Sequence, residues 1–89
     1  MATMFVRHTV SDYKIWRRAY NDFSPVQKAK GVTAEAVYQS ADNPNDITVT
    51  HEFASLETAQ AFAKSDELKK AMQNAGVTGS PTIWFANKV

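Results

Sequence analysis

The chain of 89 residues has no cysteine, only three glycines and three prolines, and no long apolar run. The missing cysteines exclude disulfides, thiolate zinc sites and cysteine nucleophiles. No apolar run approaches the roughly 20 residues that span a bilayer. The first residues also lack the basic and apolar regions of a secretory signal. We therefore expect a cytoplasmic protein with no membrane partner.

The chain also has no large excess of charge of one sign, because its ten Lys and Arg residues nearly balance its nine Asp and Glu residues. A net charge of +1 argues against a polybasic surface, so we expect no nucleic-acid partner. Hydrophobic residues make up 44% of the chain and include ten aromatics, which is typical of a globular protein. No repeat, linker or low-complexity segment is visible, so residues 1–89 are expected to form one domain.

The polar and apolar pattern predicts the following segments: a strand over 5–10, a helix over 12–23 capped by Ser11, a short helical piece to residue 30, strands over 32–40 and 47–53, a two-part helix over 55–75 and a strand over 82–86. The order β-α-β-β-α-β indicates an α+β, ferredoxin-like fold. Its four-stranded antiparallel sheet would carry two helices on one face. We expect the first and third strands to be parallel neighbours in the middle of this sheet.

Large apolar side chains point to both faces of the predicted sheet. Ile83 and Phe85 share one face of the last strand and Trp84 lies on the other, while Phe5 and Val6 alternate on the first strand. A sheet face that met water would be polar at every second position. The economical partner for the second face is another copy of the chain, which predicts a homodimer. The alternative is that Trp84 only lies under a loop.

Two histidines are the main candidates for chemistry. His8 and His51 each lie on an apolar face of a strand predicted to be central. If these faces coincide, two imidazoles come close together in apolar surroundings, where they could do acid–base work or anchor a ligand. Two histidines without a third ligand make a poor metal site, so we expect no metal. The alternative is that both are structural.

One stripe of the first predicted helix is aromatic. Tyr13, Trp16, Tyr20 and Phe23 recur at spacings of three and four residues, which is typical of a face packed into a core. Tyr13 and Trp16 lie near the helix start, where they could also reach a cleft between helix and sheet.

Charged residues on the central strands give a weaker prediction. Arg7 and Glu52 are expected to form an exposed ion pair of little energetic weight. Glu52 alternates with His51 and should therefore point away from it.

Short segments along nearly the whole chain match a known family pattern. They are Val6-Arg7-His8, Asp12-Tyr13-x-x-Trp16, Ser40 to Asp46, His51-Glu52-Phe53, Ala59 with Phe62, Ala71-Met72, Ala75-Gly76-Val77 and Gly79-x-Pro81. In these segments the chain resembles the dimeric α+β barrel superfamily, especially small proteins grouped with antibiotic biosynthesis monooxygenase-like domains. The resemblance implies a homodimer whose two sheets close into a barrel, with a pocket between each sheet and its own helices.

The resemblance also implies a range of activities. Related enzymes include cofactor-independent oxygenases of aromatic polyketides, haem-degrading oxygenases and polyketide cyclases, which work with pocket Asn, Trp, His and Tyr residues. Here residues 55–75 contain no Trp and a single Asn, Asn74. The remaining candidates are closer in type to a cyclase or a binding protein.

We therefore expect a pocket that binds an apolar aromatic small molecule without a bound cofactor. His8 and His51 are the expected catalytic residues, and the expected substrate contacts are Tyr13, Trp16, Phe53 and Phe62. The enzyme would be monooxygenase-like or cyclase-like. The alternative is a non-catalytic dimeric binding or stress-associated module with structural histidines.

Overall fold

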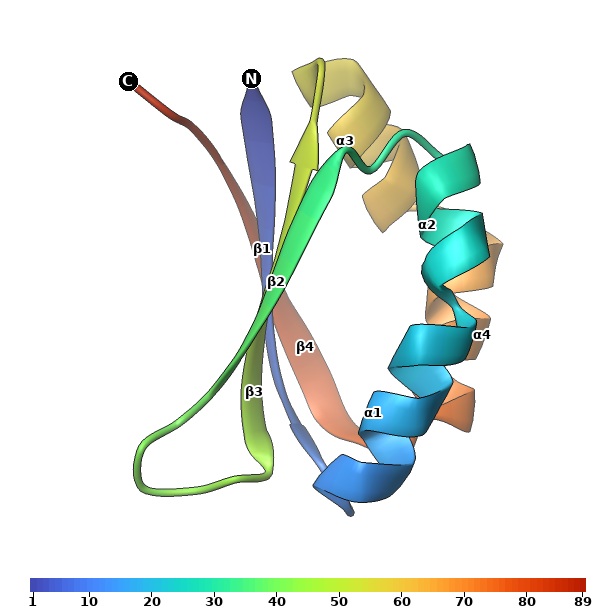
Figure 1. The fold of residues 1–89 in the computed structure, drawn as a ribbon, viewed down its shortest axis with the longest axis vertical. Coiled ribbons are helices and arrows are strands. Elements are labelled where there is room, and N and C mark those ends of the chain that lie inside the picture. Colours follow the sequence, from blue (N-terminus) through green and yellow to red (C-terminus); the bar gives the residue numbers. More distant parts are fainter.

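One four-stranded sheet carries helices on a single face, as shown by the computed structural model, which describes all residues from 1 to 89 (Figure 1). In chain order the elements are β1 (Ala2–Val10), α1 (Tyr13–Asp22), α2 (Ser24–Ala29), β2 (Ala34–Gln39), β3 (Asp46–Phe53), α3 (Leu56–Ala63), α4 (Asp66–Asn74) and β4 (Val77–Asn87). The strand order is β2-β3-β1-β4, and all neighbours are antiparallel. The α+β, ferredoxin-like prediction is confirmed, and so are the two predicted pairs of helical pieces, 12–23 with the piece to residue 30 and the two parts of 55–75.

The central strands are adjacent as predicted, but the expected parallel direction is wrong. β1 and β3 pair antiparallel, with Val6 opposite Val49. The cause is the connection through α1 and α2. It returns the chain to the end of the sheet at which β1 began, so that β2 runs parallel to β1. The hairpin then brings β3 back between them in the opposite direction.

The last strand is longer than predicted, because it begins at Val77 instead of Thr82. Its register against β1 changes from Arg7 opposite Thr82 to Thr9 opposite Thr78. The segment 79–81 therefore forms a bulge instead of a loop before the strand.

Helix α1 is capped by Asp12, one residue after the predicted cap. An Asp12 carboxylate oxygen accepts hydrogen bonds from the backbone N–H groups of Lys14, at 2.9 Å, and Ile15, at 3.5 Å. The Ser11 N–H instead donates to the Gly76 carbonyl at 3.0 Å, which joins the end of β1 to the start of β4.

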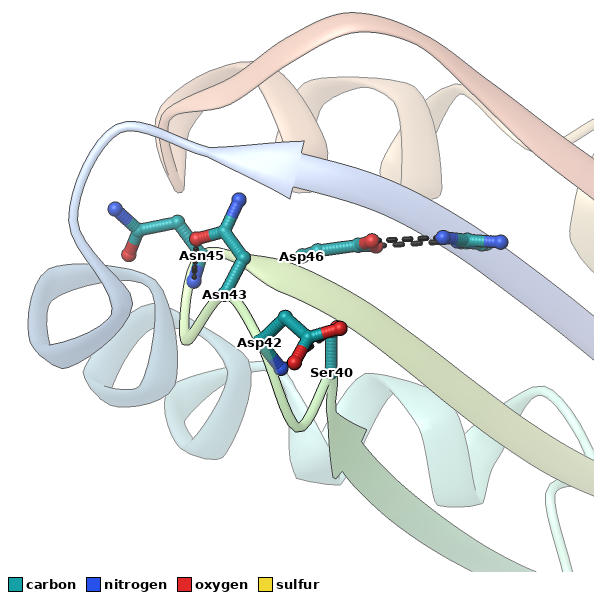
Figure 2. Close-up of polar contacts among 6 residues, drawn as sticks. Ser40, Asp42, Asn43, Asn45 and Asp46 are labelled. Carbon is teal, nitrogen blue, oxygen red and sulfur yellow. Dashed lines mark hydrogen bonds and ion pairs between the residues drawn. The ribbon is translucent and has the colours of Figure 1, made fainter.

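The hairpin between β2 and β3 is built from side chains that bond to nearby backbone (Figure 2). Ser40 Oγ accepts from the Asp42 N–H at 3.3 Å, and Asn43 Oδ1 accepts from the Asn45 N–H at 3.0 Å. Asn45 Oδ1 in turn accepts from the Tyr13 N–H at 3.1 Å. The turn is thereby attached to the first residue of α1.

Arg7 pairs with Asp46, not with Glu52 as expected. Arg7 Nη2 lies 2.7 Å from Asp46 Oδ2, and Nε donates to Oδ1 at 3.1 Å. Glu52 is opposite Thr3 in the register, four positions from Arg7, whereas Asp46 is opposite Thr9 and therefore diagonal to Arg7 on the same face.

The helix-covered face of the sheet holds the core in two clusters. Around Phe53, one cluster contains Met4, Val6, Ala59, Phe62 and Leu68. Around Trp16, the other contains Val10, Ile47, Val49 and Ala75. On β1 the burial alternates strictly, so that Met4, Val6 and His8 face the helices while Phe5 and Arg7 face away.

The opposite face has no helix over it (Figure 1). Phe5 and Trp84 stack there with ring centroids 5.2 Å apart and an interplanar angle of 4°. Trp84 is 42% exposed, and Tyr38 on β2, the opposite edge strand, is 58% exposed. Trp84 therefore does not lie under a loop, and the alternative considered for it is wrong.

No helix is long and apolar enough to cross a membrane, and the cytoplasmic location stays a prediction.

Candidate functional site

A pocket lies between the sheet and the helices. Val6 and His8 from β1 and Val49 and His51 from β3 line its sheet side. Its helix side is lined by Trp16, Ala19, Tyr20, Phe23, Gln27, Leu68, Ala71, Met72 and Ala75. The empty space is about 430 Å³ including the mouth, but the centres of water molecules reach only about 40 Å³ of it. The pocket is thus predominantly apolar and narrow, with room for a few waters as it stands.

The two histidines lie on the same side of the sheet and line this same pocket. His8 is opposite Ile47, and His51 is opposite Met4, so the Val6–Val49 pair separates them. His51 is four positions after Ile47 on β3, which corresponds to about 13 Å along the strand. The imidazoles therefore share the pocket but stand toward its two ends, instead of close together as expected.

Each histidine is held by aromatic rings. His8 meets Trp16 edge to face, with centroids 5.7 Å apart, and His51 meets Phe62 in the same way at 5.5 Å. Only 7% of His8 and 3% of His51 is exposed. The Nδ1 atom of each ring is buried and has no hydrogen-bond partner.

Polar groups gather at the His51 end of the pocket. The Tyr20 hydroxyl donates to Glu35 Oε2 at 2.7 Å and lies 3.4 Å from His51 Nε2. Glu35 is exposed on β2 and faces the helices because it is opposite His51 in the register. The Arg17 guanidinium lies 5.5 Å above the Tyr20 ring. A continuous polar path thus runs from the pocket to solvent.

Burial controls the protonation of these groups. It lowers the pKa of His51 to about 4, against a small opposing effect of the Glu35 carboxylate. It also lowers the pKa of His8. Burial, together with the neighbouring Glu35, raises the pKa of the Tyr20 hydroxyl. At neutral pH both imidazoles are therefore uncharged and each keeps a lone pair that can accept a proton or a hydrogen bond.

The predicted ligand contacts divide into two groups. Trp16 lines the pocket and stacks on Tyr20 with centroids 4.9 Å apart. Phe53 and Phe62 are fully buried in the core cluster, and Tyr13 lies beyond Trp16. None of these three lines the pocket. Asn74 is exposed and is not part of it either.

Three polar residues of this site were not identified from the sequence. Tyr20 was visible on the aromatic stripe but was not selected as a functional residue. Gln27 is 3% exposed in a short helix that carries no pattern, and Glu35 looks like an ordinary alternating strand residue. Only the strand register, which places Glu35 opposite His51, could have connected it to the site.

No three His, Asp or Glu side chains come close enough to hold a metal ion. A second, open hollow, with no hydrophobic residue in its lining, lies beside the bulge of β4. It is lined by Arg7, His8, Thr9, Asp46, Thr78, Gly79, Ser80 and Thr82. The Arg7 guanidinium in this hollow is already paired with Asp46, so we regard the apolar pocket as the candidate site.

The sequence model of a family described as antibiotic biosynthesis monooxygenase matches residues 12–74. No curated protein sequence matches the chain.

Several solved structures share the fold. A candidate antibiotic biosynthesis monooxygenase from Bordetella bronchiseptica has a TM-score of 0.84 and 14% identity, covering 99% of this chain and 96% of its own. SnoaB, a cofactor-independent oxygenase from Streptomyces nogalater, has a TM-score of 0.75 and 11% identity, covering 99% and 94%. A protein of unknown function from Nitrosomonas europaea has a TM-score of 0.75 and 22% identity, covering 99% and 92%.

Proposed function

Because the chain belongs to the antibiotic biosynthesis monooxygenase family, within the dimeric α+β barrel superfamily, we propose that it binds an apolar aromatic small molecule as a homodimer. The ligand occupies the pocket between the sheet and helices α1 and α4. His8 and His51 act on it as acid–base groups. The observation that carries this proposal is one apolar pocket lined by two buried, uncharged imidazoles.

The walls of the pocket favour an aromatic ligand. Trp16 and Tyr20 contribute aromatic rings to the lining, and Val6, Val49, Leu68 and Met72 contribute aliphatic side chains. A ring system is larger than the space open to water, so the pocket has to widen on binding. Met72 is the lining residue best suited to this, because its unbranched side chain changes rotamer easily.

The open face of the sheet supports the homodimer. The stacked rings of Phe5 and Trp84, and Tyr38 on the opposite edge strand, leave large apolar groups in water when the chain is alone. Burial against the same face of a second copy, around a two-fold axis, removes them from water. Sedimentation equilibrium should therefore report a dimer, and Trp84→Ser should shift the equilibrium toward the monomer.

A binding titration tests the ligand proposal. With ¹⁵N-labelled protein, 2-methylnaphthalene should shift the amide signals of residues around Trp16 and Met72. The double variant His8→Ala/His51→Ala should lose this response while remaining dimeric, and Gln60→Ala, on the exposed face of α3, should retain it. Binding that survives in the double variant would refute the role of the histidines. No response from the unaltered chain would favour a non-catalytic module.

Family membership favours oxygenation as the reaction class, and SnoaB, with the same fold, is described as a cofactor-independent oxygenase. In this second proposal the protein supplies orientation and a dry pocket, and no metal or flavin takes part. An oxygen electrode tests it: addition of the purified chain should accelerate oxygen uptake by a readily oxidised aromatic enol such as 1-naphthol. An unchanged rate would leave acid–base chemistry, of the kind a cyclase uses, as the activity to test.

A further inference from the structure

The two buried histidines differ in what holds them. Both Nδ1 atoms lack a partner, but only His51 has a polar group at its other nitrogen. No side-chain hydrogen bond fixes His8, whose ring packs against Trp16. The difference indicates that the two imidazoles have different tasks.

The hydrogen bonds of Tyr20 determine where the proton of His51 lies. A carboxylate only accepts hydrogen bonds, so the Tyr20 hydroxyl proton points to Glu35 Oε2 at 2.7 Å. The oxygen of Tyr20 is then free to accept a hydrogen bond but has no proton to give to His51. The 3.4 Å contact with His51 Nε2 is therefore favourable only if Nε2 carries the proton. In a neutral ring, this leaves Nδ1 without a proton.

From this geometry we propose that Tyr20 and Glu35 are positioning residues, which hold His51 as the Nε2–H tautomer and make its Nδ1 atom the proton acceptor for the pocket's ligand. This inference rests on the proposed function, because it assigns the atom of the site at which a ligand proton is received. The burial of Nδ1 supports it. An unpaired acceptor in a side chain that is 3% exposed is costly, and a ligand donor would remove the cost.

The same contacts provide a path for the proton. The O–H bond of a ligand hydroxyl breaks as its proton bonds to His51 Nδ1, and the Nε2 proton passes to the Tyr20 oxygen. The original hydroxyl proton of Tyr20 passes to the Glu35 carboxylate, which is exposed and releases it to water. The ligand keeps the electron pair as an oxyanion, and His51 ends neutral with its proton on Nδ1. No oxidant or reductant takes part.

The groups facing this path come from four elements. Helix α1 contributes Arg17, over the Tyr20 ring, β2 contributes Glu35, and α2 contributes the uncharged Gln27 beside the hydroxyl. The positive charge of Arg17 lowers the pKa of the Tyr20 hydroxyl, against the larger rise caused by burial and Glu35, and so assists the loss of its proton to Glu35. Phe62 meets the His51 ring edge to face and adds no charge.

The tautomer of His51 can be measured in the ligand-free protein. Long-range ¹H–¹⁵N correlation spectra at pH 7.5 should show a protonated Nε2 and an unprotonated Nδ1 for His51. Tyr20→Phe should abolish this preference and produce a mixture or the Nδ1–H form, with an unchanged circular dichroism spectrum. Glu35→Gln should weaken the preference. Protonated Nδ1 in the unaltered chain, or an unchanged tautomer in Tyr20→Phe, would overturn the proposal.

A matched ligand pair tests the acceptor. The compounds 2-naphthol and 2-methylnaphthalene have nearly the same shape, but only the first carries a hydrogen-bond donor. The unaltered chain should bind 2-naphthol about five- to tenfold more tightly, the ordinary effect of one hydrogen bond in a buried site. Tyr20→Phe should remove most of this preference while binding of 2-methylnaphthalene persists, and Gln60→Ala should keep it.

Equal affinity of the unaltered chain for the two compounds would refute the acceptor role while the proposed binding function stood. Failure of both compounds to bind would refute the proposed function. The assignment of Tyr20 and Glu35 would then be decided by the tautomer alone, since that measurement needs no ligand.

Discussion

Acid should destabilise the fold through His51, and the size of the effect follows from its burial. The pKa of His51 is about 4 in the folded chain and about 6.5 when the chain is unfolded. Between these values the unfolded state binds more protons, so the free energy of unfolding falls as the pH is lowered. The contribution of the uncharged His51 to the free energy of unfolding is retained at pH values above its unfolded pKa of about 6.5. The loss from this group is about 2 kcal/mol between pH 7.5 and pH 5, and about 3 kcal/mol at pH 4.

Urea unfolding at fixed protein concentration, in steps from pH 7.5 to pH 4.5, measures this loss. The concentration must stay fixed because a dimer's apparent stability depends on it. His51→Gln is the matched variant, since an amide does not titrate and can still bond to Tyr20. The difference between the two chains isolates His51 from other groups, including His8, whose pKa is also lowered by burial, and Asp46, whose pKa Arg7 lowers. A variant with the same pH slope as the unaltered chain would refute the reasoning.

Three further substitutions test other parts of the structure by urea unfolding at pH 7.5. Trp16→Ala should cost about 3–5 kcal/mol, because it removes a ring that is 3% exposed and covers His8; a cost below about 1 kcal/mol would contradict the packing. Asp12→Ala should cost about 0.5–2 kcal/mol as the loss of a helix cap, whereas Ser11→Ala should change little, and the reverse order would restore the predicted cap. Gly31→Ala should cost more than Gly79→Ala. Both have positive φ, but only at Gly31 would the new Cβ lie 2.8 Å from Thr58 Cγ2, and equal costs would show that Thr58 moves freely.

The spacing of apolar residues predicted the fold, because it matches the helical and strand periods closely in this chain. The alternation of Ile47, Val49 and His51 identified the buried face of β3, and the aromatic stripe identified the buried face of α1. The bulge after Val77 was missed because Gly79 and Pro81 resemble a loop in sequence, although they lie within a strand. The direction of β3 relative to β1 depends on the crossover, which a single-strand pattern does not contain.

The site was only partly predictable. Both histidines were identified because an imidazole among valines on a strand is conspicuous. Their separation was not predictable, since it depends on the pairing register of β1 and β3. Phe53 and Phe62 were predicted to be ligand contacts, but both are packed too deeply to reach the pocket. Glu35 acquires its role only through a neighbouring strand and a helix, which bring it to Tyr20.

The strict alternation of β1 separates the residues that affect ligand preference from those that affect assembly with a second copy, so the two properties can change independently during evolution. Met4, Val6 and His8 contact the interior, while Phe5 and Arg7 face the opposite side of the same strand. A change at Val6 or His8, which line the pocket, can therefore alter what the pocket accepts without altering the surface offered to a second copy. Libraries randomised at positions 6 and 8 should yield chains with new ligand preferences and the parental assembly. Libraries at positions 5 and 7 should yield the converse.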